Sequence, residues 1–168
     1  TTKDFMIQLS NAATISKIET QDWTDAENVI VVELADTSLG NYEYSLDGIN
    51  YQDSNTFSGL ISGDYTVYVR DKNGCGTVNQ EVFLLNYPKY FTPNQDGYND
   101  TWAVKFSASE PSLVVRIFDR YGKLLKELGA TSAWDGTYNG HELPSTDYWF
   151  VVTRANGKVY KGHFAMKR

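Results

Sequence analysis

Short segments in which apolar and polar residues alternate recur along this chain of 168 residues, separated by glycine, asparagine and aspartate. Residues 65–69 are the clearest case, because Tyr65, Val67 and Val69 would share one face of an extended strand. An alternation of period two is typical of β-strands, and no segment keeps the period of an amphipathic α-helix. The pattern predicts an all-β chain, built as two small Ig-like β-sandwich domains in tandem.

Individual strands follow from the same alternation. We expect them at residues 5–9, 15–19, 29–34, 42–46, 65–70 and 78–85, and then at 102–106, 113–119, 123–128, 148–154 and 158–164. Residues 29–32 are apolar without interruption, which is typical of a strand covered on both faces. Residues 57–65 are interpreted as a crossover. Asn156-Gly157 tolerates positive φ and predicts a tight hairpin turn.

The densest turn signals lie at residues 87–102, where Pro88, Pro93 and Asp96-Gly97 fall close together. The charge changes at the same place. Residues 1–88 hold four basic and thirteen acidic side chains, a net of −9, whereas residues 89–168 hold eleven basic and eight acidic, a net of +3. We therefore expect a fibronectin-like or Ig-like stalk domain at 1–88 and a second domain at 89–168.

Several function classes are disfavoured. The acidic first half argues against a nucleic-acid partner, and no apolar run approaches the roughly 20 residues of a membrane-spanning helix. Cys75 is the only cysteine and cannot form an internal disulfide. His141 and His163 are the only histidines, and neither stands beside a nucleophile in the sequence, so we expect no enzyme and no cofactor.

Six blocks of the second half resemble, in the family's order, the type B C-terminal sorting domain of type IX secretion system substrates, also called the gliding-motility-associated C-terminal domain, of Bacteroidota. They are residues 90–94 (YFTPN), 96–102 (DGYNDTW), 117–123 (IFDRYGK), 134–140 (WDGTYNG), 143–150 (LPSTDYWF) and 161–164 (KGHF). One departure is Gln95, where the family usually has glycine. The first half more loosely resembles the Ig-like repeats of surface adhesins, through residues 44–48 (YSLDG), 57–60 (FSGL) and 69–75 (VRDKNGC).

The resemblance implies a folded address tag on an exported protein. After passage to the periplasm, the tag would be read by the type IX outer-membrane translocon, with a small outer-membrane protein of the PorP/SprF type as partner, and the protein would reach the cell surface or be secreted. No signal peptide precedes Thr1-Thr2, so we expect the chain to be the end of a longer protein.

The recognition surface is expected on the loops and the last strands of the second domain. Its candidate residues are Asn94, Asp96, Gly97, Asn99, Asp100, Trp134, Asp135, Tyr138, Tyr148, Trp149, Lys161, His163 and Phe164. A short edge strand at residues 158–164 would add to a partner's sheet. The alternative is a carbohydrate-binding or adhesive Ig-like module, with rings such as Trp134 and Tyr138 stacked on a glycan. For these two rings, packing under the loop is the other interpretation.

Calcium is the one metal that the sequence brings into question. Aligned with an EF-hand loop, Asn94, Asp96 and Asp100 fall at positions three, five and nine, but Thr92 and Ala103 at positions one and twelve supply no carboxylate. We therefore expect no firm metal site. Ca²⁺ at Asn94, Asp96 and Asp100 is the alternative to a turn cluster in which these side chains accept backbone N–H groups.

Overall fold

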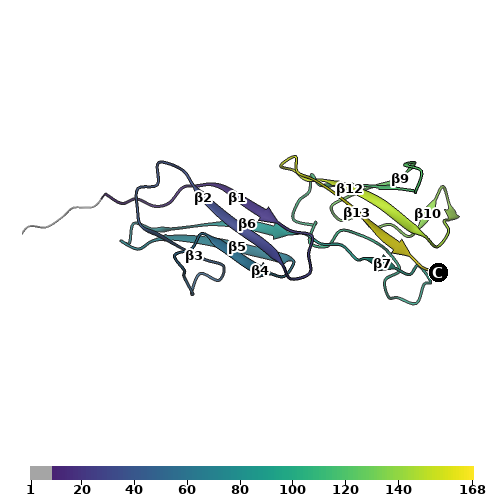
Figure 1. Cartoon of the computed structure of the whole chain (residues 1–168), viewed down its shortest axis with the longest axis horizontal. Coiled ribbons are helices and arrows are strands. Elements are labelled where there is room, and N and C mark those ends of the chain that lie inside the picture. Colours follow the sequence, from purple (N-terminus) through teal and green to yellow (C-terminus); the bar gives the residue numbers. More distant parts are fainter. Residues whose placement is uncertain (1–8) are drawn as a thin grey trace, which may run out of the picture. The chain divides into compact units, whose positions relative to one another are not determined.

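The computed structural model describes residues 9–168, and every regular element among them is a β-strand, which confirms the all-β prediction (Figure 1). The chain divides into two compact units between Leu84 and Leu85. The strand expected at residues 5–9 lies outside the described residues, apart from Leu9.

Two three-stranded antiparallel sheets form the N-terminal unit, with strand orders β1-β2-β4 and β3-β5-β6. The strands are β1 (Ile15–Gln21), β2 (Asn28–Leu34), β3 (Tyr42–Ser45), β4 (Thr56–Leu60), β5 (Gly63–Asp71) and β6 (Thr77–Leu84). Ile30 and Val32 of one sheet and Val67 and Val69 of the other are fully buried in a common core. The unit is therefore an Ig-like β-sandwich.

Two details of this unit differ from the prediction. β4 occupies the segment interpreted as a crossover, because Thr56 and Phe57 pair with β2. Gly59, at φ 69°, lies beside the irregularity that shifts the register of that pairing. The second difference concerns β2, which alternates between fully buried and half-buried residues and is not covered on both faces. A strand of a two-layer sandwich has only one face toward the core.

The C-terminal unit contains a five-stranded sheet of order β7-β13-β12-β8-β9 and a two-stranded hairpin, β10-β11. Its strands are β7 (Tyr90–Phe91), β8 (Val114–Phe118), β9 (Leu124–Gly129), β10 (Thr137–Tyr138), β11 (His141–Glu142), β12 (Asp147–Thr153) and β13 (Val159–Met166). Only β7 pairs in parallel, with Ala165 and Met166 of β13. In the sheet order β13 lies between β7 and β12, but β7 pairs only with Ala165 and Met166, beyond residues 158–164, so the edge strand expected there stays a prediction.

A cluster of aromatic rings fills the space under this sheet. Trp102 stacks on Phe164 with 4.0 Å between ring centroids, and Trp134 meets Tyr148 edge-on at 5.0 Å. Trp102 and Trp134 come from irregular segments that form an isolated antiparallel bridge, with backbone N–H···O distances of 2.8 Å in both directions. The second layer of this sandwich is thus made mostly of loops that carry large rings.

The strand expected at residues 102–106 does not form. Trp102 and Val104 are buried as the alternation predicts, but Phe106 has a φ of 61° and is 41% exposed. The buried Ser107 hydroxyl then donates to the carbonyl oxygens of Val104 and Ala130, at 2.9 and 2.6 Å. These bonds tie the segment to a neighbouring loop instead of to a strand.

Candidate recognition site

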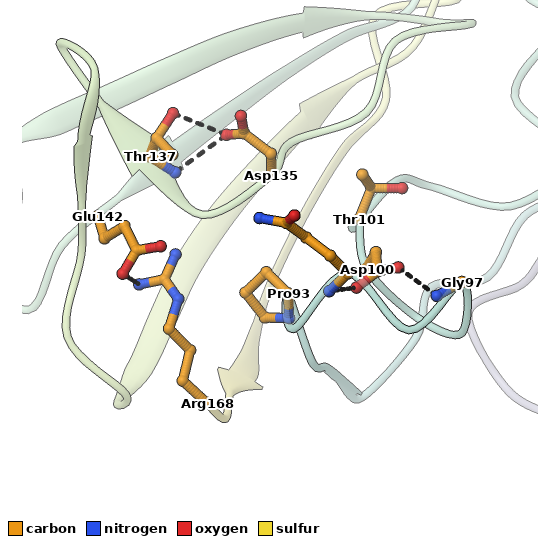
Figure 2. A pocket seen from close by; sticks show the side chains of 9 residues that line it. Pro93, Gly97, Asp100, Thr101, Asp135, Thr137, Glu142 and Arg168 are labelled. Carbon is orange, nitrogen blue, oxygen red and sulfur yellow. Dashed lines mark hydrogen bonds and ion pairs between the residues drawn. The ribbon is translucent and has the colours of Figure 1, made fainter.

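Turns from the matching blocks meet around two pockets of the C-terminal unit. The first, here called the acidic pocket, measures about 400 Å³. It is lined by Pro93, Gln95, Gly97, Asp100, Thr101, Asp135, Thr137, Glu142 and Arg168 (Figure 2). The second, the basic pocket, measures about 310 Å³. It is lined by Asp119, Arg120, Tyr121, Lys123, Leu125, Tyr138, Leu143, Pro144, Thr146 and Tyr148. The β10-β11 hairpin contributes to both.

Asp100 organises the loop that follows β7. Its Oδ1 accepts the backbone N–H groups of Asn94 and Gln95, at 3.1 and 2.6 Å, and its Oδ2 accepts that of Gly97 at 2.8 Å. Gln95 takes a φ of 65°, a conformation that glycine adopts without a steric cost. The departure from the family's glycine therefore falls at a position of positive φ, and the loop keeps its hydrogen bonds.

The neighbouring acidic residue, Asp96, completes the same loop. Its Oδ1 accepts the N–H of Tyr98 at 2.8 Å, and its Oδ2 accepts the side-chain amide of Asn94 at 2.8 Å. The backbone bond from Tyr98 and the amide of Asn94 hold the pKa of Asp96 below its ordinary value. The loop thus has the geometry of an Asx-turn cluster.

The carboxylate oxygens that a calcium ion would need are therefore already hydrogen-bonded to this loop. Residues 9–168 contain no group of three or more His, Cys, Asp or Glu side chains placed to hold a metal ion. The donor set of Asn94, Asp96 and Asp100 also lacks the bidentate glutamate of an EF-hand. Calcium binding at this loop remains the alternative to the turn cluster, for titration to test.

A second turn, around Asp135 and Gly136, forms the opposite wall of the acidic pocket (Figure 2). Oδ1 of Asp135 accepts the backbone N–H and the hydroxyl of Thr137, at 3.0 and 2.8 Å. Partial burial raises the pKa of Asp135, but these bonds outweigh it and leave the pKa below its ordinary value. Gly136 has a φ of 80°, and a Cβ there would lie 2.4 Å from the sulfur of Met166.

The third contribution comes from Arg168. Its backbone N–H donates to the Ser145 hydroxyl at 3.0 Å, and its guanidinium donates to the carbonyl oxygens of Leu143 and Gly136. The same guanidinium lies 3.9 Å from a carboxylate oxygen of Glu142. Figure 2 shows the two side chains next to each other. Arg168 thereby joins the end of β13 to the β10-β11 hairpin, and the acidic pocket has a fixed outline.

Most of the expected recognition residues lie in two places. Asn94, Asp96, Gly97, Asn99, Asp100, Asp135 and Tyr138 lie on the loops and the hairpin that surround the two pockets. Trp149, Lys161 and His163 point away from the ring cluster on the outer face of the sheet, where Trp149 pairs with His163 on one side and with Phe118 on the other. The two groups belong to different surfaces of the unit.

Three of the expected recognition residues need correction. Trp134, Tyr148 and Phe164 are only 1%, 2% and 0% exposed, because all three rings belong to the buried cluster. Packing under the loop is therefore the right interpretation for Trp134. Tyr148 reaches the basic pocket only as part of its wall.

Sequence reasoning missed the cations of the site. Arg120 and Lys123 line the basic pocket and Arg168 lines the acidic one. A signal was available for the first two, because they flank a Tyr-Gly pair between two predicted strands and must share one tight turn. No signal pointed to Arg168, whose role depends on the parallel pairing of β13 with β7.

Comparison with known proteins identifies the C-terminal unit. Residues 85–166 match the family model described as the CHU_C type IX secretion signal domain. The C-terminal unit is therefore a type IX secretion signal domain, which confirms the sorting-domain resemblance. It is a sorting module and not a member of a catalytic family, and it marks an exported protein that passes to the cell surface or is secreted.

Solved structures add little to this. The chain is similar to dimeric latent PorU from Porphyromonas gingivalis, at 14% identity and a TM-score of 0.31 over 95% of this chain and 20% of that one. It is also similar to Tp47, the 47-kilodalton lipoprotein of Treponema pallidum, at 11% identity and a TM-score of 0.32 over 96% of this chain and 52% of that one. The chain thus spans less than two thirds of either protein, and such low scores support no functional conclusion.

No curated protein matches the chain. Within residues 9–168 there is no helix with the length and apolarity that crossing a membrane requires.

Proposed function

We propose that this chain is the C-terminal part of an adhesin-like surface protein of a member of the Bacteroidota, and that its last domain is read by the type IX outer-membrane translocon through protein–protein recognition. The domains would be an Ig-like stalk, expected at 1–88, and the signal domain, expected at 89–168, whereas the compact units divide four residues earlier, between Leu84 and Leu85. A small outer-membrane protein of the PorP/SprF type, as in gliding-motility systems, is the proposed partner. The observation that carries the proposal is the family match over residues 85–166.

The geometry of the motif turns supports recognition by a rigid surface. Asp100, Asp119 and Asp135 each hold a turn through hydrogen bonds to its N–H groups, and Asp119 Oδ1 accepts the N–H groups of Tyr121 and Lys123 at 2.8 and 2.9 Å. Buried rings at Trp102 and Trp134 fix the segments that border two of these turns, because Trp102 follows the Asp100 turn and Trp134 precedes the Asp135 turn. The turns of the signal domain do not have to become ordered when a partner binds. Less conformational entropy is then lost on binding, which favours affinity.

A reporter fusion tests the proposal. An exported fluorescent reporter carries the whole 168-residue chain in one strain and only residues 1–84 in another, both in a host with an active type IX system. We expect the first reporter on the cell surface or in the medium and the second in the periplasm. A host with a disabled translocon is the control. Periplasmic retention of the full fusion in the active host would contradict the proposal.

A carbohydrate-binding role keeps one supporting observation. The Trp149 ring is 42% exposed on the outer face of the sheet, beside His163 and Phe118, and an exposed ring of this kind can stack on a sugar. A glycan array with the intact chain and with the Trp149→Ala variant tests this role. Binding that is lost in the variant would support it, while an array without signal would leave sorting as the better function.

A further inference from the structure

The basic pocket combines an apolar interior with two cations at its edge. Leu125, Leu143, Pro144 and the rings of Tyr138 and Tyr148 supply the apolar surface. The hydroxyl of Tyr148 donates to the carbonyl oxygen of Pro144 at 2.7 Å, so this polar group is satisfied within the wall. A volume of about 310 Å³ lies at the lower end of the range for pockets that take small ligands or single side chains.

Arg120 differs from the other arginines of the C-terminal unit. Arg116, Arg154 and Arg168 each lie within 4.0 Å of a glutamate oxygen. Arg120 instead donates to the hydroxyl of Thr146 at 2.5 Å, and it has no carboxylate within ion-pair distance among the described residues. This bond holds the guanidinium at the pocket while most of its N–H groups remain available.

Lys123, at the other end of the same turn, is likewise a cation of the pocket lining that is held by a neighbour other than a carboxylate. Its ammonium nitrogen lies 4.3 Å from the centre of the Tyr138 ring, a cation–π contact, and within residues 9–168 no ion pair involves it. The nearby Asp119 carboxylate is engaged through Oδ1 by two backbone N–H groups of the turn. The pocket lining therefore holds two cations against one carboxylate, and no ion pair among the described residues engages either cation.

We propose that the basic pocket binds a protein segment that places a carboxylate next to an aromatic or aliphatic side chain. The guanidinium of Arg120 offers a planar pair of donors that fits a carboxylate, and Lys123 adds a second charge. The adjacent side chain of the segment fills the apolar interior. A small inorganic anion would use only the cations, and an uncharged apolar segment would use only the interior.

As a step in export, this inference rests on the proposed function, because the segment would belong to the translocon or its outer-membrane partner. As a statement about which ligand the basic pocket binds, the inference does not depend on the proposed function. The two aspects have separate experiments, so that the failure of one is distinguishable from the failure of the other.

Peptide titration tests the binding property. The 168-residue chain, labelled with ¹⁵N, is titrated with N-acetyl-Phe-Asp-amide and with two matched probes, N-acetyl-Phe-Asn-amide and N-acetyl-Ala-Asp-amide. We expect the first to bind with a Kd on the order of millimolar and to shift the amide signals of Tyr121, Lys123 and Tyr138. Loss of the charge-assisted hydrogen bonds should weaken the asparagine probe at least about tenfold. Absent binding, or equal binding of all three probes, would overturn the proposal.

Two charge-reversing variants locate the site. Lys123→Glu should abolish the binding of N-acetyl-Phe-Asp-amide, whereas Lys105→Glu makes the same charge change at an exposed residue that lines neither pocket and is not among the expected recognition residues. Thermal unfolding shows whether each variant is folded. If Lys123→Glu fails to fold, Arg120→Gln replaces it, since its neutral amide keeps a donor toward Thr146. Equal loss of binding in the Lys105 variant would contradict the assignment.

The export assay then tests the role in sorting. The reporter fused to the Lys123→Glu chain should stay in the periplasm while the Lys105→Glu fusion is exported. If the unaltered fusion is retained, the proposed function fails, and the peptide titration still decides on the pocket. If a folded Lys123→Glu chain that no longer binds the peptide is exported normally, the pocket has no part in export.

Discussion

Gly136 shows how one residue of the signal domain is constrained by two independent features. Its φ is 80°, which costs about 1–2 kcal/mol for a residue with a side chain, and a Cβ would lie 2.4 Å from the Met166 sulfur and 3.3 Å from the Phe91 ring. Gly140 has nearly the same φ, 79°, but nothing within 4 Å of its Cβ position. A comparison of substitutions at Gly136 and Gly140 therefore separates the effect of the steric clash from the effect of the positive φ.

We predict that Gly136→Ala destabilises the C-terminal unit by at least about 1 kcal/mol more than Gly140→Ala, because only the first overpacks its surroundings. Chemical unfolding of the two variants in urea, followed by circular dichroism, provides the comparison. Equal losses would show that the Met166 side chain moves aside without cost.

Also at the scale of single residues, the Asp71 carboxyl makes the stability of the N-terminal unit depend on pH. Burial raises the pKa of this carboxyl, but hydrogen bonds from Ser10 and Cys75 outweigh it and lower the pKa from 3.8 to about 2. A depressed pKa stabilises the folded state above the unfolded value and loses that effect as the pH falls through the folded value. The contribution of Asp71 should therefore disappear between about pH 4 and pH 2.

We predict that Asp71→Asn lowers the melting temperature of the N-terminal unit at pH 6, and that the difference from the unaltered chain shrinks as the pH falls toward 2. Asp47, whose pKa is lowered chiefly by the side chain and backbone of Asn50, also loses stabilisation in acid. Because Asp47 is present in both chains, the difference isolates Asp71. A difference that is independent of pH would contradict the assignment.

At the scale of elements, the loops of the second layer depend on their rings. Trp102 is fully buried against Phe164, and its indole N–H donates to the carbonyl oxygen of Pro88 at 2.9 Å. Trp149 lies on the other face of the same sheet and is 42% exposed. We predict that Trp102→Ala costs about 3–5 kcal/mol of unfolding free energy and Trp149→Ala less than about 1 kcal/mol. Urea unfolding of both variants checks this, and similar losses would mean that the loop layer packs loosely.

The loop at residues 92–101 depends on hydrogen bonds instead. We predict that Asp100→Ala speeds hydrogen exchange at the amides of Gln95 and Gly97, which lose their acceptor, and leaves the amides of β12 unchanged.

We further predict that millimolar Ca²⁺ changes neither the exchange nor the melting temperature of the unaltered chain, because the loop oxygens already have donors. A rise in melting temperature that a chelator reverses would establish a calcium site.

The alternation of apolar and polar residues predicted the strands correctly wherever a strand has one buried face, as in β5. The Asn156-Gly157 pair likewise predicted the hairpin between β12 and β13. The alternation failed at Trp102 and Phe106, where buried residues alternate in a segment that turns away at a positive φ. The expectation that Trp134 belongs to the recognition surface was wrong, because this ring lies next to an Asp-Gly turn and is nevertheless buried. The burial of Trp134 follows from its bridge to Trp102, a long-range contact that no local pattern contains.

At the scale of the whole molecule, the charge break indicated a boundary at Pro88, whereas the two compact units separate between Leu84 and Leu85. Residues 85–88 carry no charge, so the charge pattern does not place them. Their packing does. The Tyr87 ring meets Phe150 edge-on at 4.7 Å, Asn86 forms a bridge with Lys105, and Pro88 accepts the indole N–H of Trp102. The family match likewise begins at residue 85.

We predict that residues 85–168 fold when produced alone and are more stable than residues 89–168, by about 3 kcal/mol. The shorter fragment loses a ring that is 8% exposed in the folded chain and the acceptor of the Trp102 indole. Urea unfolding of both fragments measures the difference, and Tyr87→Ala in the longer one tests whether the ring supplies most of it. Because Tyr87 packs on Trp102 and Phe150 in the ring cluster that also contains Tyr148 of the pocket wall, we expect the 89–168 fragment to bind N-acetyl-Phe-Asp-amide more weakly. Equal stability of the two fragments would place the start of the signal domain at Lys89.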